Sequence, residues 1–255
     1  MNKKGFTLAE VLITLGIIGV VAAITMPILI GNYQKTVYVN QLKKCVSTLE
    51  QGFQMALAKD GVFELENTSL IKSMGNASSQ DNETFFNEFK KYFKVIDIKE
   101  SGFDEWGGYK YINGDDASGG GDYFSNAIYL ADGSKLILNI GGVQHKNIAT
   151  CNRIKELGGN LCSVISTDCF YIDINGDKGP NQFGRDYFAF ELGNNGRLYP
   201  SAGKDYALYS TQIELSSNSG YWNSSNADDW AKCDTSFEGW SCAARIIESG
   251  WKMDY

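Results

Sequence analysis

Apolar residues fill positions 6–30 almost without interruption, and Glu10 is the one charged residue in that run. A helix of about 20 apolar residues spans a bilayer, so the run is long enough to cross a membrane. Lys3 and Lys4 precede it. Because basic residues stay on the cytoplasmic side, they predict a cytoplasmic N-terminus and an exported remainder.

After Pro27 the apolar residues recur at three- and four-residue spacing, which is typical of a helix with one apolar face. Asp60 and Gly61 end this pattern. We therefore expect one long helix, apolar all round over residues 6–30 and amphipathic over residues 31–60. The predicted buried stripe contains Tyr33, Val37, Leu42, Cys45 or Val46, Leu49, Phe53 and Leu57.

Two hairpins are predicted further along the chain, over residues 127–138 and 188–199. Each consists of two short apolar segments around a turn sequence, Asp132-Gly133 in the first and residues 194–196 (Asn-Asn-Gly) in the second. Such hairpins imply an antiparallel sheet packed on the long helix. The predicted fold class is α+β, with residues 61–255 forming the globular domain.

The segments around the hairpins have different patterns. Residues 67–82 are polar and are expected to form a loop, whereas phenylalanines at helical spacing predict a second amphipathic helix over residues 85–95. Beyond Tyr206 the chain is rich in Ser, Asn, Trp and Asp, which predicts an irregular, disulfide-tied surface region.

Charge argues against a general nucleic-acid-binding surface. The 255-residue chain has a net charge of −7, and its basic residues are scattered beyond the N-terminus. Affinity for nucleic acid depends on clustered cations, which this sequence lacks.

The six cysteines form an even set with no Cys-x-x-Cys pair, so disulfides in an oxidising compartment are favoured over a zinc or thioredoxin-like site. The short loop between Cys233 and Cys242 makes that pair the preferred disulfide. Cys45 is a candidate for joining the helix to the domain. The disulfide candidates are Cys45, Cys151, Cys162, Cys169, Cys233 and Cys242.

Glu10 distinguishes three interpretations of the N-terminus: a cleaved secretory signal, a plain signal anchor and a prepilin leader. A carboxylate in the apolar part of a bilayer costs on the order of 2.5–3.5 kcal/mol, so it requires a partner. Neither a disposable signal nor a plain anchor needs such a residue. Glu10 therefore favours the prepilin interpretation.

The segment Lys3-Lys4-Gly5-Phe6-Thr7-Leu8-Ala9-Glu10-Val11-Leu12 resembles the N-terminal signature of type IV pilins and type II secretion pseudopilins. The resemblance implies a leader over residues 1–5. A prepilin peptidase would cleave between Gly5 and Phe6 and methylate Phe6. Glu10 would then meet the N-terminal amine of a neighbouring subunit during assembly.

The resemblance also implies a pilin-like lollipop shape, in which the helix carries the globular domain. Pro27 lies where the family has a helix-kinking proline, although it could equally mark the end of the membrane segment. Expected partners are other pilin or pseudopilin subunits and an inner-membrane assembly platform. The expected location is the bacterial inner membrane, then a periplasmic pseudopilus or a surface pilus.

Residues 173–186, which we call the acidic loop, suggest a calcium site. Its oxygen-bearing residues alternate with glycines, and calcium takes about 6–8 oxygen ligands. The segment departs from an EF-hand, since Lys178 replaces the required glycine, but it resembles a loop of some pseudopilins that bind calcium. A turn without metal is the alternative. The tentative ligands are Asp173, Asn175, Asp177, Asn181 and Asp186.

No sequence feature indicates an enzyme. His145 is the only histidine, and the chain contains neither a Gly-x-Ser-x-Gly elbow nor a P-loop. The preferred function is a structural filament subunit. The alternative is a membrane-anchored glycan- or surface-binding protein, in which aromatic side chains stack on sugars. The aromatic candidates are Tyr221, Trp222, Trp230, Trp240 and Trp251.

Overall fold

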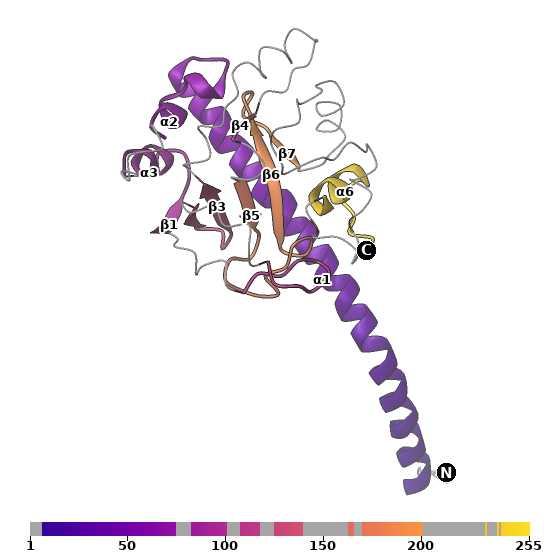
Figure 1. The fold of residues 1–255 in the computed structure, drawn as a ribbon. Helices are drawn as coiled ribbons and strands as arrows, with labels where there is room; N and C mark the ends of the chain where they lie inside the picture. The colour runs from indigo at the N-terminus through magenta and orange to yellow at the C-terminus, as the bar shows by residue number, and fades with distance from the viewer. Residues whose placement is uncertain are drawn as a thin grey trace, which may run out of the picture.

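A single long helix, α1, runs through the globular domain and projects from it toward the N-terminus (Figure 1). The computed structural model describes residues 7–74, 83–100, 108–117, 125–139, 163–165, 170–200, 233, 239 and 241–255. Its elements are α1 (Leu8–Asp60), η1 (Leu65–Asn67), α2 (Ser69–Lys72), α3 (Glu83–Phe89), β1 (Val95–Glu100), β2 (Ser125–Leu130), β3 (Lys135–Asn139), β4 (Ser163–Ile165), β5 (Phe170–Asp173), β6 (Tyr187–Gly193), β7 (Leu198–Pro200) and α6 (Cys242–Glu248).

The two halves of α1 differ in burial, as their apolar patterns require. The first buried residue is Val39, and Val37 and Tyr38 just before it are half-buried. Nearly all of the earlier apolar side chains are exposed, including Tyr33 of the predicted stripe at 70%. Pro27 lies inside the helix, which continues through it to Asp60. Gly61 then ends the helix in the left-handed conformation with φ 65°. Pro27 therefore neither melts nor terminates α1.

The strands form a seven-stranded sheet in the order β1-β2-β3-β5-β6-β4, with β7 also paired to β6. All of the described pairs are antiparallel. The β2–β3 and β6–β7 pairs are the two predicted hairpins. The predicted α+β class and antiparallel sheet are confirmed.

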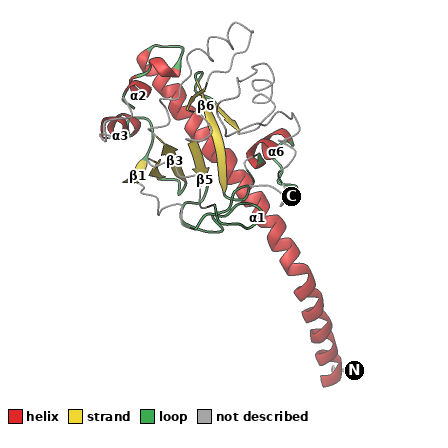
Figure 2. Cartoon of the chain, in the orientation of Figure 1, coloured by secondary structure: helices red, strands yellow, loops and turns green. Residues whose placement is uncertain are grey.

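One face of the sheet packs against α1 to form the main core. Alternate residues point to that face, because successive side chains of a strand lie on opposite sides. Figure 2 shows the helix crossing behind the central strands. The fully buried strand residues of this core include Ile128, Leu136, Phe170, Ile172, Phe190 and Leu192, which join Leu42, Leu49 and Phe53 of α1.

The opposite face of the central strands carries a second, aromatic cluster. It contains Tyr109, Ala117, Ile137, Tyr171, Phe183, Tyr187 and Ala189. The Tyr171 and Tyr187 rings stack 5.4 Å apart, and Tyr109 lies 4.4 Å from Tyr187, measured between centroids. Both faces of the central strands are therefore covered.

Two of the sequence-based expectations about segments are wrong. The second helix does not extend over residues 85–95, because α3 ends at Phe89 and β1 begins at Val95. Phe93 still packs on the Phe89 ring at 4.2 Å, so the aromatic spacing continues after the helix has ended. The segment 67–82 is not wholly a loop, since it contains α2 with Leu70 fully buried.

The C-terminal region also differs from the expected irregular surface. Its described part contains the helix α6, in which Ala243, Ala244 and Ile246 are fully buried. The predicted disulfide between Cys233 and Cys242 is present. Cys45 does not join the helix to the domain, because its thiol is free and buried, and burial raises its pKa to about 12. Cys151, Cys162 and Cys169 lie outside the described residues.

Gly52 gives a direct test of the packing between α1 and the domain. A Cβ added there would lie 2.1 Å from the Phe93 ring, so we expect Gly52→Ala to lower the free energy of unfolding by roughly 1–3 kcal/mol. Alanine is the better helix former, so propensity alone predicts stabilisation. Denaturant unfolding of the full chain in micelles measures the difference. Gly31→Ala, with no atom within 4 Å of the added Cβ, is the control.

Candidate functional site

The N-terminus of α1 is closed by a reciprocal pair of residues, Thr7 and Glu10. The Glu10 backbone N–H donates to Thr7 Oγ1 at 3.3 Å, while the Thr7 backbone N–H donates to Glu10 Oε2 at 2.8 Å. The Thr7 hydroxyl donates to the same carboxylate oxygen at 2.8 Å. This capping box satisfies backbone donors that a helix N-terminus otherwise leaves open.

The apolar half of α1 has the properties of a membrane span. Among the described residues, α1 is the one helix that is long and apolar enough to cross a membrane, and none of its apolar window is buried. The Thr14 and Thr25 hydroxyls donate at 2.9 Å to backbone carbonyls one turn earlier. Both hydroxyls therefore find their hydrogen-bond partners within the helix. The Glu10 carboxylate therefore lies at the start of an uncovered apolar surface, and Thr7 is its partner within the chain.

The N-terminal segment matches a known family model. Residues 1–26 match the model described as the prokaryotic N-terminal methylation motif. The chain carries the type IV pilin and pseudopilin signature. This motif covers the residues that the sequence singled out, Gly5, Phe6 and Glu10, although Gly5 and Phe6 lie outside the described part of the structure.

Comparison of the chain with curated proteins finds no match, and comparison with solved structures finds none either. The similarity to type IV pilins and pseudopilins therefore rests on the N-terminal motif, and the projecting helix and α+β domain are consistent with it.

The acidic loop connects β5 to β6 of the globular domain, beside α1. The Asp186 charge contributes to a raised pKa of the Tyr38 hydroxyl on α1, after the larger effect of partial burial. Loop segments gather where α1 leaves the sheet (Figure 2). The loop thus lies at the end of the domain from which the apolar half of the helix projects.

The predicted calcium ligands fall into two groups around different partners. Asp173 and Asp177 contact the ammonium of Lys135, at 3.7 and 2.9 Å from Nζ. Asp186 instead accepts three N–H donors, from the backbones of Asn181 and Gln182 and from the Asn175 side chain. Their distances are 2.9, 2.7 and 3.2 Å.

The carboxylates of these two groups do not come together as one cluster. Within the described residues, no cluster of three or more His, Cys, Asp or Glu side chains could hold a metal ion. Asn175 Oδ1 and Asn181 Oδ1 are buried acceptors without a hydrogen-bond partner, so they are the members of the set that could face a cation. Calcium takes about 6–8 oxygen ligands, so carboxylates, backbone carbonyls or water would have to supply the others. Calcium binding by this chain stays a prediction.

The Lys135 group includes two tyrosines that sequence reasoning missed. The Tyr109 hydroxyl donates to Asp173 Oδ2 at 2.5 Å, and the Tyr129 hydroxyl donates to Asp177 Oδ1 at 3.0 Å. Burial raises the pKa of Asp173 to about 7, outweighing the Tyr109 bond and the Lys135 charge. The hydrogen bond from Lys135 lowers the pKa of the more exposed Asp177.

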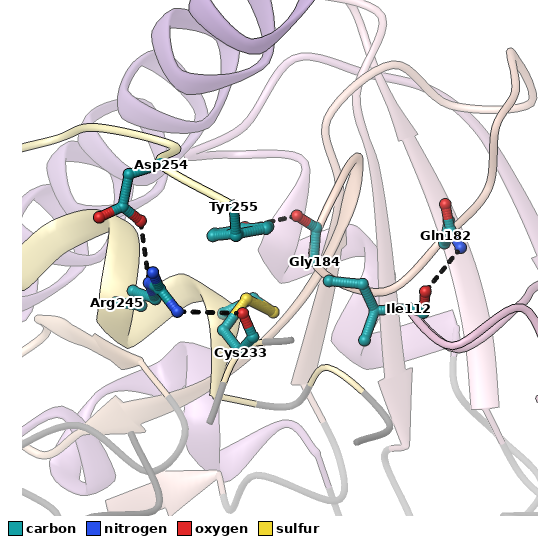
Figure 3. Close-up of a disulfide and its surroundings, with 8 residues drawn as sticks. Ile112, Gln182, Gly184, Cys233, Arg245, Asp254 and Tyr255 are labelled. Atoms are coloured by element: carbon teal, nitrogen blue, oxygen red, sulfur yellow. Dashed lines mark hydrogen bonds and ion pairs between the residues drawn. A yellow bond between two sulfur atoms is a disulfide. The ribbon is translucent and has the colours of Figure 1, made fainter. Parts of the chain in front are cut away.

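The far end of the acidic loop is held by the C-terminal segment (Figure 3). The Tyr255 hydroxyl donates to the Gly184 carbonyl at 2.5 Å. Gly184 has φ 78°, and a Cβ there would lie 2.5 Å from Cys242 Sγ. Arg245 Nη1 donates to the Cys233 carbonyl at 3.2 Å, beside the disulfide. The loop, the disulfide and the chain end therefore pack as one unit.

Replacing Thr7 should loosen the start of α1. Thr7→Val keeps the side-chain shape but removes the hydroxyl, at a cost of about 1 kcal/mol. We expect roughly fivefold faster hydrogen exchange at the Glu10 backbone N–H, measured by NMR on the full chain in micelles. Thr7→Ser retains the hydroxyl and should leave the rate unchanged. Equal rates for Thr7→Val and the native chain would contradict the capping role.

Asp173 should make stability fall as pH rises. Its folded pKa of about 7 exceeds the ordinary value, so the protonated carboxyl favours folding. This contribution is complete below about pH 4 and is lost as pH rises to about 7. Asp173→Asn removes this pH-dependent contribution. The Tm of the variant should therefore fall less between pH 4 and 8 than the Tm of the native chain. An unchanged slope would show that Asp173 titrates normally.

Proposed function

We propose that this chain is a structural subunit, a pilin or pseudopilin, of a bacterial type IV pilus or type II secretion filament. The observation that carries the proposal is the methylation motif at residues 1–26, which continues into a helix whose apolar half is uncovered. An exposed apolar helix of this kind requires either lipid or neighbouring helices around it.

The subunit is inserted in the inner membrane through α1, with its C-terminal domain exported. A prepilin peptidase removes residues 1–5 by cleaving between Gly5 and Phe6, and the new N-terminus at Phe6 is methylated. An inner-membrane assembly platform then moves the subunit from the bilayer into the filament. The same apolar surface of α1 therefore faces lipid first and other subunits afterwards.

The charge on Glu10 selects the position of the neighbouring subunit. Cleavage creates an ammonium at Phe6, and two opposite charges tolerate burial far better together than either does alone. Glu10 already has Thr7 as its partner in the separate subunit. In the assembled filament the Phe6 amine of the adjacent subunit thus approaches a Glu10 carboxylate that already accepts hydrogen bonds from Thr7.

The domain supports a mechanical role rather than an enzymatic one. Several of its described charged side chains make structural contacts, such as the Lys135 group and the Arg245–Asp254 pair. The long region beyond Tyr206, with its disulfide, favours a minor or tip subunit within the filament. Its partners are then major subunits of the same helical assembly.

Glu10→Gln removes the charge that we propose acts in assembly but keeps the helix cap. Glutamine can still accept from Thr7, as capping boxes allow, but it cannot neutralise a neighbouring amine. Since a buried unpaired ammonium costs more than about 1.4 kcal/mol, we expect at least a tenfold loss of assembled subunit, measured by shearing or cross-linking of filaments from cells.

Glu83→Gln on the exposed start of α3 is the matched control and should assemble normally. Mass spectrometry of the mature native chain should show an N-methylated Phe6. Normal filament levels for Glu10→Gln, or a mature chain starting after Ala23, would reject the proposed function.

A further inference from the structure

Lys135 is placed to act on the acidic loop from a neighbouring strand. It begins β3 and is paired in register with Asp173, the last residue of β5. Its side chain is buried, and its ammonium reaches Asp173 and also Asp177, four residues further along. One internal cation therefore links the strand end to the first turn of the loop.

We propose that the Lys135 ammonium takes the place of a divalent cation in the acidic loop, so that the loop folds without calcium. The inference goes beyond the filament role and is independent of it. The loop sequence is rich in potential calcium ligands, but its carboxylate oxygens accept hydrogen bonds and ion pairs from groups of the same chain.

The surroundings of Lys135 match an ammonium better than a hard metal ion. The rings of Tyr109 and Tyr129 lie over Nζ, at 5.2 and 5.6 Å from their centroids. Aromatic faces attract an ammonium, whereas calcium needs oxygen ligands on all sides. Both ring hydroxyls are turned to the carboxylates instead, as donors to Asp173 and Asp177.

Electrostatics also disfavours a metal ion at this position. The fully buried Asp173 carboxyl already accepts hydrogen bonds from the Tyr109 hydroxyl and from the Asn175 backbone N–H, the latter at 3.2 Å. The Lys135 ammonium also lies nearby. A dication beside the same two carboxylates would lie within a few ångströms of a fixed positive charge. That repulsion is strong on the side of Asp173, where water is excluded, and weaker near Asp177, whose side chain is 64% exposed.

In the second half of the loop the Asp186 carboxylate is held by N–H donors, while Asn175 Oδ1 and Asn181 Oδ1 are buried without a hydrogen-bond partner. Asp186 is fully buried and accepts from Asn181, Gln182 and Asn175. The Ile174 backbone N–H donates to the Asp186 carbonyl at 2.9 Å, which joins the two ends of the loop. Each carboxylate of the predicted calcium set therefore has a partner within the chain.

The test compares thermal unfolding of the full chain in micelles with 5 mM EGTA and with 5 mM calcium chloride, concentrations of the order used for weak extracellular calcium sites. The native chain should have the same Tm in both. Lys135→Gln leaves the two carboxylates without their cation, and its Tm in EGTA should fall by roughly 5–10 °C.

Lys178→Gln is the matched control, because Lys178 is an exposed lysine of the same loop. Its Tm should remain within about 1 °C of the native value, as for most surface substitutions. A Tm of the native chain that rises with calcium, or calorimetric binding of calcium alone at millimolar concentration, would overturn the proposal. So would a Lys135→Gln variant as stable as Lys178→Gln. If Lys135→Gln does not fold, the native calcium titration still decides.

Discussion

Burial of one face of α1 against the antiparallel sheet is the contact on which the other parts of the domain depend. From Val39 onward the helix supplies a continuous apolar stripe, and the sheet supplies the alternate side chains that cover it. No other described helix is long enough to span the domain; α6 has 7 residues. The domain is therefore built around the same helix that projects from it.

The sequence was sufficient to predict the elements whose signals are local. The long helix, both hairpins and the Cys233–Cys242 disulfide follow from spacing, turn residues and loop length, and the structure contains all of them. The boundary between α3 and β1 was missed because the phenylalanine spacing runs on from Phe89 to Phe93 after the helix has ended. There the sheet pairing of Val95–Glu100 overrides the helical pattern.

The acidic loop shows which part of a site local sequence cannot supply. Its carboxylates were found from spacing, but Lys135 and Tyr109 lie at distant positions in the chain and approach only through the β3–β5 pairing and the second aromatic cluster. Because strand pairing brings the Lys135 ammonium to the loop, no sequence motif near the loop indicates it. The buried α6 was missed for a similar reason, since the seven residues of this short helix become a core element only through contact with β6 and the disulfide.

The capping box at Thr7 has a consequence for Glu10 before assembly. Because Glu10 is hydrogen-bonded within its own helix, the filament subunit that we propose would lie in the bilayer with its carboxylate already accommodated. Assembly would then exchange one hydrogen-bonding partner of Glu10 for another and would not start from a bare charge.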